Sequence, residues 1–246
     1  MLRGVLWLAL LAPQAVEMAG LPPVEELVAK NLASRGGIER LQAVKSMRLT
    51  GRLTVAPGRE APVTIEMKRP NKVRLEFQFL GKTGVQAFDG ETAWRVLPFR
   101  GIPAPEKLPE AETAAVRQES DFDGPLVGWR QKGLDVKVVA QETYQDALAW
   151  RLRITFPDQS RKDVWLDALQ CLERKSESSR RVRGETQLGE SLLLDYREVE
   201  GLRMPHAFEN GKTGASERQR LTITQVELNS ELDDARFAMP QAPAME

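Results

Sequence analysis

The sequence predicts an α+β protein built on one large, curved antiparallel sheet of about ten to eleven strands. Three observations lead to this prediction. From Lys45 onward, apolar residues recur at every second position through most of the chain, which is the period of strands that bury one face. The connections between these runs are short, and short connections join antiparallel neighbours. Helical signals are confined to residues 22–44 and to an insertion at 98–133, which we expect to cover the sheet.

Two stretches carry these helical signals. Over residues 22–44, apolar side chains recur at the spacing of one helix face, and two glutamates stand in the first turn, where the helix dipole favours them. A Gly-Gly pair ends this helix, and residues 38–44 add a further turn or two. In the mid-chain insertion we expect a helix over residues 109–119 and a second short helix after Gly124.

Length and charge limit the class of protein. The chain has 246 residues, of which 41% are hydrophobic and 28% are charged, and its formal net charge is +0. Sheet proteins of this size commonly form a single unit, so we expect one domain over residues 21–246. A balanced charge offers no field that would attract nucleic acid, and we expect no such partner.

The N-terminus reads "MLRGVLWLALLAPQAV", in which one early cation, Arg3, precedes an apolar run over residues 5–12. This pattern is typical of a secretory signal peptide, and the run is too short to span a bilayer. We place the signal at residues 1–20, with cleavage between Val16 and Leu21; an uncleaved membrane anchor is the alternative. No cysteine directly follows the run, so we expect no lipid-acceptor site. The prediction is a periplasmic protein, exported and soluble after cleavage.

Residues suited to catalysis or metal binding are scarce. The chain contains one cysteine, Cys171, and one histidine, His206, whereas zinc sites draw on several such side chains. The acidic stretch "ESDFDG", residues 119–124, lacks the closing glutamate of a calcium loop and fits a turn between helices. We therefore expect a protein that is not an enzyme and that binds no metal or cofactor. A pair of catalytic carboxylates, as in glycosidases, is an open alternative, because the distance between two such groups depends on the tertiary structure.

The stretch "VRLEFQF", residues 73–79, shows the strand period most clearly, because one parity is apolar and the other is polar. Residues 150–156 repeat this pattern. Two interpretations of the apolar face remain open. It either packs against the helices as an ordinary core, or it leaves a gap beneath them that serves as a pocket for an acyl chain.

Five stretches, taken in order, resemble the outer-membrane lipoprotein-sorting proteins, the family of the periplasmic carrier LolA and the receptor LolB. They are "KNLASRGGIERLQAVKSMRLTGR" (30–52), "MKRPNKVRLEF" (67–77), "FDGETAW" (88–94), "VEGLRMPHAFE" (199–209) and "DDARFAMP" (233–240). Together they run through most of the mature chain. The resemblance implies an incomplete β-barrel that is closed by helices and whose apolar inner face receives the acyl chains of lipids or lipoproteins.

The resemblance also implies where the acyl chains bind. The candidate cavity wall consists of Val73, Leu75, Phe77, Phe79, Trp94, Trp150, Leu152 and Ile154, while Arg74, Glu76 and Gln78 meet water. The family's carriers use an arginine that bonds to carbonyls of a lid helix and an exposed loop that enters the membrane. The sequence alone identifies neither feature in this chain.

The resemblance implies a monomeric carrier in lipoprotein sorting to the outer membrane. Its partners would be an inner-membrane releasing complex, an outer-membrane receptor and, transiently, the membrane itself. A second hypothesis is an envelope-stress sensor or protein-interaction module with the same fold, in which a partner protein takes the place of the lipid. A lipid hydrolase is the third hypothesis, and the single histidine, His206, argues against it.

Overall fold

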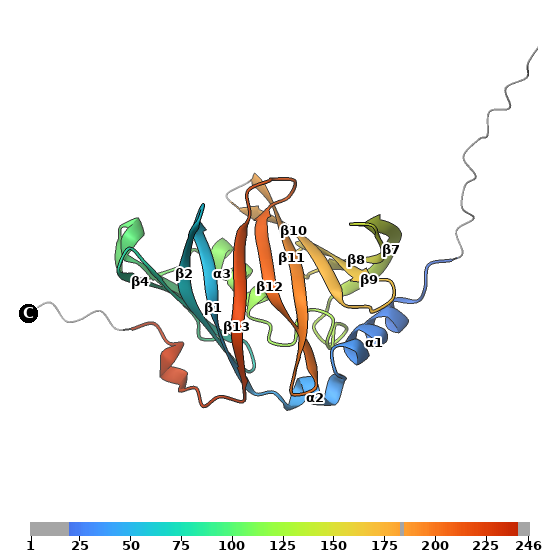
Figure 1. Ribbon diagram of the computed structural model, residues 1–246, viewed down its shortest axis with the longest axis horizontal. Helices are drawn as coiled ribbons and strands as arrows, with labels where there is room; N and C mark the ends of the chain where they lie inside the picture. The colour runs from blue at the N-terminus through green and yellow to red at the C-terminus, as the bar shows by residue number, and fades with distance from the viewer. Residues whose placement is uncertain (1–19, 183–184, 241–246) are drawn as a thin grey trace, which may run out of the picture.

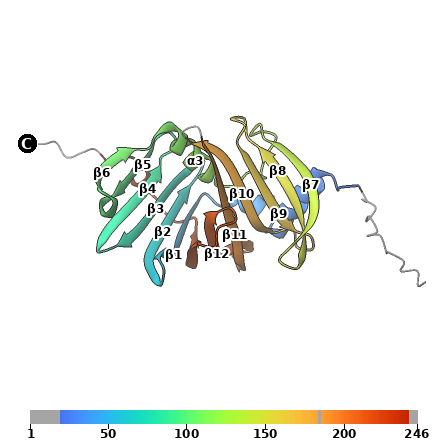
Figure 2. The ribbon, with the colours of Figure 1, turned by 90° about the horizontal axis from the view of Figure 1, so that it is seen from above.

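The computed structural model describes residues 20–182 and 185–240. All thirteen strands in this part of the chain form one antiparallel sheet, which curves into an open trough with β6 and β7 as its free edges (Figures 1 and 2). The predicted α+β class with a large, curved and incompletely closed sheet is confirmed. Apart from Gly20, the predicted signal peptide lies outside the described residues.

The elements have the following bounds. The helices are α1 (Val24–Ser34), α2 (Ile38–Ala43) and α3 (Glu110–Glu119), with short 3₁₀ turns η1 (Pro98–Arg100) and η2 (Asp234–Arg236). The first six strands are β1 (Ser46–Ala56), β2 (Arg59–Lys68), β3 (Lys72–Phe79), β4 (Lys82–Phe88), β5 (Ala93–Leu97) and β6 (Ile102–Lys107). The others are β7 (Asp135–Tyr144), β8 (Ala147–Thr155), β9 (Arg161–Asp167), β10 (Glu173–Val182), β11 (Glu185–Val199), β12 (Leu202–Lys212) and β13 (Gln219–Leu228).

The strand order, β6-β5-β4-β3-β2-β1-β13-β12-β11-β10-β9-β8-β7, has one consequence for the rest of the chain. The first six strands run from the centre of the sheet to one edge, and the last seven return from the other edge to the centre. The segment 108–134 must therefore cross the whole width of the sheet. Its helix, α3, contacts both β5 and β10 beside the trough (Figure 2).

Two local predictions are wrong. The proline-punctuated start of the insertion forms an additional strand, β6, which is compatible with Pro103 and Pro105 because an edge strand has one side without hydrogen bonds. The short helix expected after Gly124 is absent, and residues 124–133 form consecutive turns. Gly124, Gly128 and Gly133 all have left-handed backbones, with φ of 77°, 61° and 68°, which a continuous α-helix does not accommodate.

The concave face of the sheet carries the main core. Helix α1 lies across it beside the strands of the β7 edge and buries Leu27 and Val28 (Figure 1). These side chains pack in one cluster with residues of β8 and β9 and of the crossing segment, including Leu152, Val164 and Leu126. All five are at most 6% exposed. Burial of this kind is the dominant favourable contribution to folding.

The convex face is covered as well, by the C-terminal segment 229–239. Trp94 is 1% exposed and its Nε1 donates a hydrogen bond of 2.8 Å to the carbonyl of Phe237. Glu66, also 1% exposed, accepts a 2.7 Å bond from Nε of Arg236. A buried carboxylate requires such a cation. The segment therefore acts as a strap over the β1–β5 half of the sheet.

Substitution of Phe237 tests the strap. Phe237 is fully buried, so we expect Phe237→Ala to lower the free energy of unfolding by about 3–5 kcal/mol, as buried Phe to Ala changes do. The measurement is chemical denaturation. Glu231→Ala, at an exposed position of the same segment, is the control and should change stability by less than about 0.5 kcal/mol. An equally small loss of stability in the two variants would contradict a structural role of the strap.

Candidate functional site

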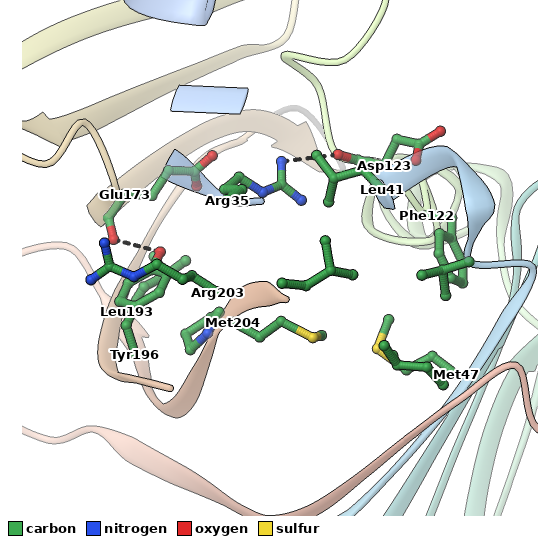
Figure 3. Close-up of a pocket in the computed structure, with 14 residues that line it drawn as sticks. Arg35, Leu41, Met47, Phe122, Asp123, Glu173, Leu193, Tyr196, Arg203 and Met204 are labelled. Atoms are coloured by element: carbon green, nitrogen blue, oxygen red, sulfur yellow. Dashed lines mark hydrogen bonds between the residues drawn. The ribbon is translucent and has the colours of Figure 1, made fainter. Parts of the chain in front are cut away.

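An apolar cavity of about 170 Å³ lies on the concave side, beneath α2 (Figure 3). The roof consists of α2 and the loop 121–124, and the floor consists of the strands around the centre of the sheet. The apolar lining residues are Leu41, Val44, Met47, Phe122, Leu193, Leu202, Met204 and Leu228. Apolar cavities of comparable size accept small apolar ligands.

Polar residues also line this cavity, namely Arg35, Asp123, Glu173, Tyr196 and Arg203. Nη1 of Arg35 donates a 3.3 Å hydrogen bond to the carbonyl of Asp123, and the hydroxyl of Tyr196 donates a 2.8 Å bond to the carbonyl of Glu173 (Figure 3). Burial raises the pKa of Tyr196 well above its ordinary value, so the phenol is neutral. The rest of the lining is apolar, and the cavity is suited to an alkyl group.

Arg69 holds the roof in place. Arg69 directly follows β2 in the chain, and its side chain reaches between α2 and the loop 121–124. Nε donates to the carbonyl of Val44 at 2.6 Å and Nη2 to that of Leu41 at 2.9 Å, which are carbonyls at the C-terminal end of α2. Both terminal nitrogens also bond to the carboxylate of Asp123, at 2.6 Å each. The guanidinium lies 4.6 Å from the ring centroid of Phe122.

We call these contacts of Arg69 with α2 and Asp123 the latch, because they hold the roof in place. Carbonyls in the last turn of a helix have no intrahelical partner and carry negative partial charge, which a cation at that end neutralises. The planar guanidinium forms a bidentate pair with the carboxylate of Asp123, which is the strongest arrangement available to arginine. Arg69 thus joins two roof elements that have no covalent connection nearby. The sequence alone did not identify this contact.

The predicted wall residues lie elsewhere. Leu152 and Ile154 are fully buried, and with Trp150 they pack against α1 and the crossing segment. Val73 packs on the cluster of Phe88, Ala93, Leu108 and Val116 under α3. None of the eight predicted residues is among those that line the 170 Å³ cavity.

Phe77 and Phe79 stand at a free corner of the sheet, half-buried against Phe99, with ring centroids 5.4 Å and 5.5 Å from it. Leu75 is half-buried on the same strand. These residues share the concave parity of β3, as expected from the sequence, but α2 and its cavity lie over other strands.

Trp94 requires a correction. Residues paired across neighbouring strands share a face, and Trp94 pairs with Ala87, which pairs with Arg74. Trp94 therefore lies on the convex face, opposite to Val73. Arg74 is also drier than expected, because it is 17% exposed and donates a 3.2 Å bond to the carbonyl of Arg236 in the strap. Alternation assigns residues to faces within one strand, but cannot align the faces of separate strands.

The acidic stretch at residues 119–124 serves the fold. Asp123 is bound by Arg69, and Asp121 forms a 2.6 Å ion pair with Lys132. His206 is buried, and its Nδ1 lies 3.0 Å from the carbonyl of Met204. Among the described residues, no group of three or more His, Cys, Asp or Glu side chains is arranged to hold a metal ion.

No family model matches the sequence, and no curated protein matches it. Similar proteins are found by comparison with solved structures. A LolA superfamily protein from Nitrosomonas europaea is 14% identical and superposes with a TM-score of 0.58, covering 87% of this chain and 96% of its own. A domain from Vibrio parahaemolyticus, described as outer membrane lipoprotein-sorting, is 12% identical with a TM-score of 0.57, over 85% and 97% of the two chains. This chain has a LolA-like fold.

A third structure extends the range of the LolA-like fold. A DUF1329 family protein from Desulfovibrio piger ATCC 29098 superposes with a TM-score of 0.62 at 10% identity, over 89% of this chain and 98% of its own. At such identities the likeness concerns the fold. No helix within residues 20–182 and 185–240 is long and apolar enough to cross a membrane.

Removal of the latch should loosen the roof. We expect Arg69→Ala to destabilise the protein by about 2–3 kcal/mol, because it leaves the half-buried carboxylate of Asp123 and two helix-end carbonyls without their donor. Amide hydrogen exchange should accelerate in α2 more than in α1. Arg52→Ala, which removes an exposed arginine of β1 in a 4.0 Å pair, should cost less than about 0.5 kcal/mol. Unchanged exchange in α2 would contradict the latch.

Proposed function

We propose that the protein is a periplasmic carrier that binds the acyl chains of lipids or lipoproteins beneath α2 and takes part in lipoprotein sorting to the outer membrane. The observation that carries the proposal is an apolar cavity whose roof is held by one charged side chain, Arg69. The LolA-like fold and the lipoprotein-sorting description of one structural neighbour support it. The proposed work is binding and release, without bond chemistry.

The small cavity is a resting state in this proposal. Its volume of about 170 Å³ is below the roughly 300–1,000 Å³ of most ligand sites, so a whole acyl chain requires the roof to lift. Each buried CH₂ contributes about 0.8 kcal/mol, and a few methylene groups are enough to offset the loss of the Arg69 contacts. An inner-membrane releasing complex and an outer-membrane receptor would shift the roof between its two positions.

The corner of the sheet between β3 and β4 supplies a place for transient membrane contact. Leu80 at its tip is 62% exposed, and the aromatic group of Phe77, Phe79 and Phe99 lies directly behind it. The exposed side chains of Arg59 and Lys82 flank this apolar tip. Apolar residues bordered by cations favour the boundary between lipid headgroups and acyl chains.

The alternative is an envelope-stress sensor or protein-interaction module. The small volume of the cavity favours it, as does the packing of the predicted wall residues Leu152 and Ile154 in the main core. Native mass spectrometry of protein purified from its own envelope separates the two functions. A carrier retains lipid adducts, whereas a protein that emerges bare and fails to bind a fluorescent fatty acid is not a carrier.

Filling the cavity should abolish lipid binding at little cost to the fold. In Met204→Trp the larger side chain enters the void beneath α2, so we expect stability to change by less than about 1 kcal/mol and affinity for a fluorescent fatty acid to fall at least about tenfold. Val164→Phe is the control, because Val164 is fully buried in the main core and does not line the cavity. It should destabilise by about 1–3 kcal/mol. Unaltered fatty-acid binding by Met204→Trp would place the ligand elsewhere.

The membrane-contact corner has its own test. We expect Leu80→Asp to reduce co-sedimentation with lipid vesicles by several-fold, because it places a charge at the apolar tip. Leu148→Asp changes a comparably exposed leucine, 53% against 62%, at the far edge of the sheet and should leave sedimentation unchanged. Equal effects of the two variants would exclude a specific role for the β3–β4 corner.

A further inference from the structure

A second cleft, of about 850 Å³, opens on the concave side next to the apolar cavity. It lies between α3 with the crossing segment and the strands β9 to β12. The lining of this cleft is mostly polar: it combines serines of β10 and β11 with charged residues such as Arg117, Arg161 and Lys162. Ser176 pairs with Val164 of the main core across β9 and β10, so the serine side of β10 is the concave one.

Serine hydroxyls are presented at alternate positions in this cleft. Ser176 and Ser178 lie two apart on β10, and Ser191 lies on β11. Ser191 donates a 2.6 Å bond to Asn210, but no hydrogen bond joins the hydroxyl of Ser176 or Ser178 to another residue in the described part of the chain. Gly189 keeps the space beside them open, because a Cβ there would lie 3.1 Å from Oγ of Ser178.

Lys162 places a cation in the same cleft. It pairs across the sheet with Ser178 on one side and with the fully buried Ile154 on the other, so it shares their concave face. Lys162 is half-buried and has no carboxylate or hydrogen-bond partner in the described part of the chain. The other described lysines without a side-chain partner are all exposed: Lys45, Lys82, Lys107 and Lys212. A half-buried ammonium group is normally paired, and this one faces a cavity.

The acidic residues that line the cleft do not neutralise the positive charge of Lys162. Glu190 is held by Lys175 and Arg218, and Asp121 by Lys132. Glu119 is engaged in an interaction of its own. The positive charge of Lys162 and the free serine hydroxyls therefore favour an anion with several acceptor oxygens. A phosphate group meets this description, and lysine binds phosphate as a point charge.

The cleft and the cavity are neighbours. Ser191 lines the cleft and Leu193 lines the cavity, two residues apart and about 7 Å along one face of β11. Asp121 faces the cleft, and Phe122 and Asp123 face the cavity, so the loop that Arg69 holds is the wall between them. We propose that the cleft binds the phosphate-bearing headgroup of the amphiphile whose acyl chain enters the cavity. This inference rests on the proposed carrier function.

Two lipids with the same chain test the inference by calorimetric titration. Lysophosphatidic acid carries the phosphate, and the monoacylglycerol of the same chain does not. We expect the wild type to bind lysophosphatidic acid at least about tenfold more tightly, the contribution of one charge-assisted hydrogen bond. Lys162→Gln should remove this preference and leave monoacylglycerol binding unchanged, and Lys162→Arg should retain it. Gly189→Val should selectively weaken the binding of lysophosphatidic acid, because the valine side chain fills part of the cleft. Thermal unfolding of each variant checks that the fold is intact.

The outcomes separate the two proposals. Equal affinities of the wild type for the two lipids would overturn the headgroup site and leave the carrier function standing. If neither lipid binds, the carrier function fails and the headgroup site fails with it. Inorganic phosphate is the second anion source. Inorganic phosphate by itself could bind the wild type as tightly as lysophosphatidic acid does and lose the same affinity in Lys162→Gln. In that case the cleft is a site for free phosphate and the headgroup proposal is overturned.

Discussion

The contact on which the site depends is that of the Arg69 guanidinium with the end of α2 and with Asp123. One planar cation satisfies carbonyls that a helix end leaves without partners and neutralises a half-buried carboxylate on another segment. It thereby fixes the helix over the sheet and the loop beside the helix at the same time. The apolar cavity beneath α2, and the wall between that cavity and the polar cleft, both exist because these two elements are held together.

The strand order makes such a contact necessary. Since β1 and β13 pair at the centre of the sheet, the chain has to pass from the edge at β6 to the edge at β7, and the crossing segment lies over the concave face. A long segment of turns carries little hydrogen bonding of its own and is ordered by what it packs on. Leu126 anchors it to the core below α1, and Asp123 anchors it to Arg69.

The two faces of the sheet are fixed by different segments. The strap over the convex side of β1–β5 fixes that half with buried contacts at Trp94, Phe237 and Glu66. Helix α1 fixes the concave side of the other half, where the amide of Asn31, itself fully buried, donates to the carbonyl of Cys171 at 2.8 Å. Between these fixed parts, α2 and the crossing segment lie over the strands at the centre of the sheet, where both the apolar cavity and the polar cleft are found.

The sequence by itself determined the class of fold, the helices at α1, α2 and α3, and the faces of individual strands, because a period of two or 3.6 residues is a local property. Tertiary structure decided which face each segment covers. Arg74 and the carbonyl it binds at Arg236 are 162 residues apart, and Arg69 and Asp123 are 54 apart. Among 35 lysines and arginines, nothing local distinguishes Arg69, and nothing local places Trp94 on the convex side. The position of the cavity follows from such distant contacts, so the alternation of residues 73–79 predicted an apolar face without locating the site.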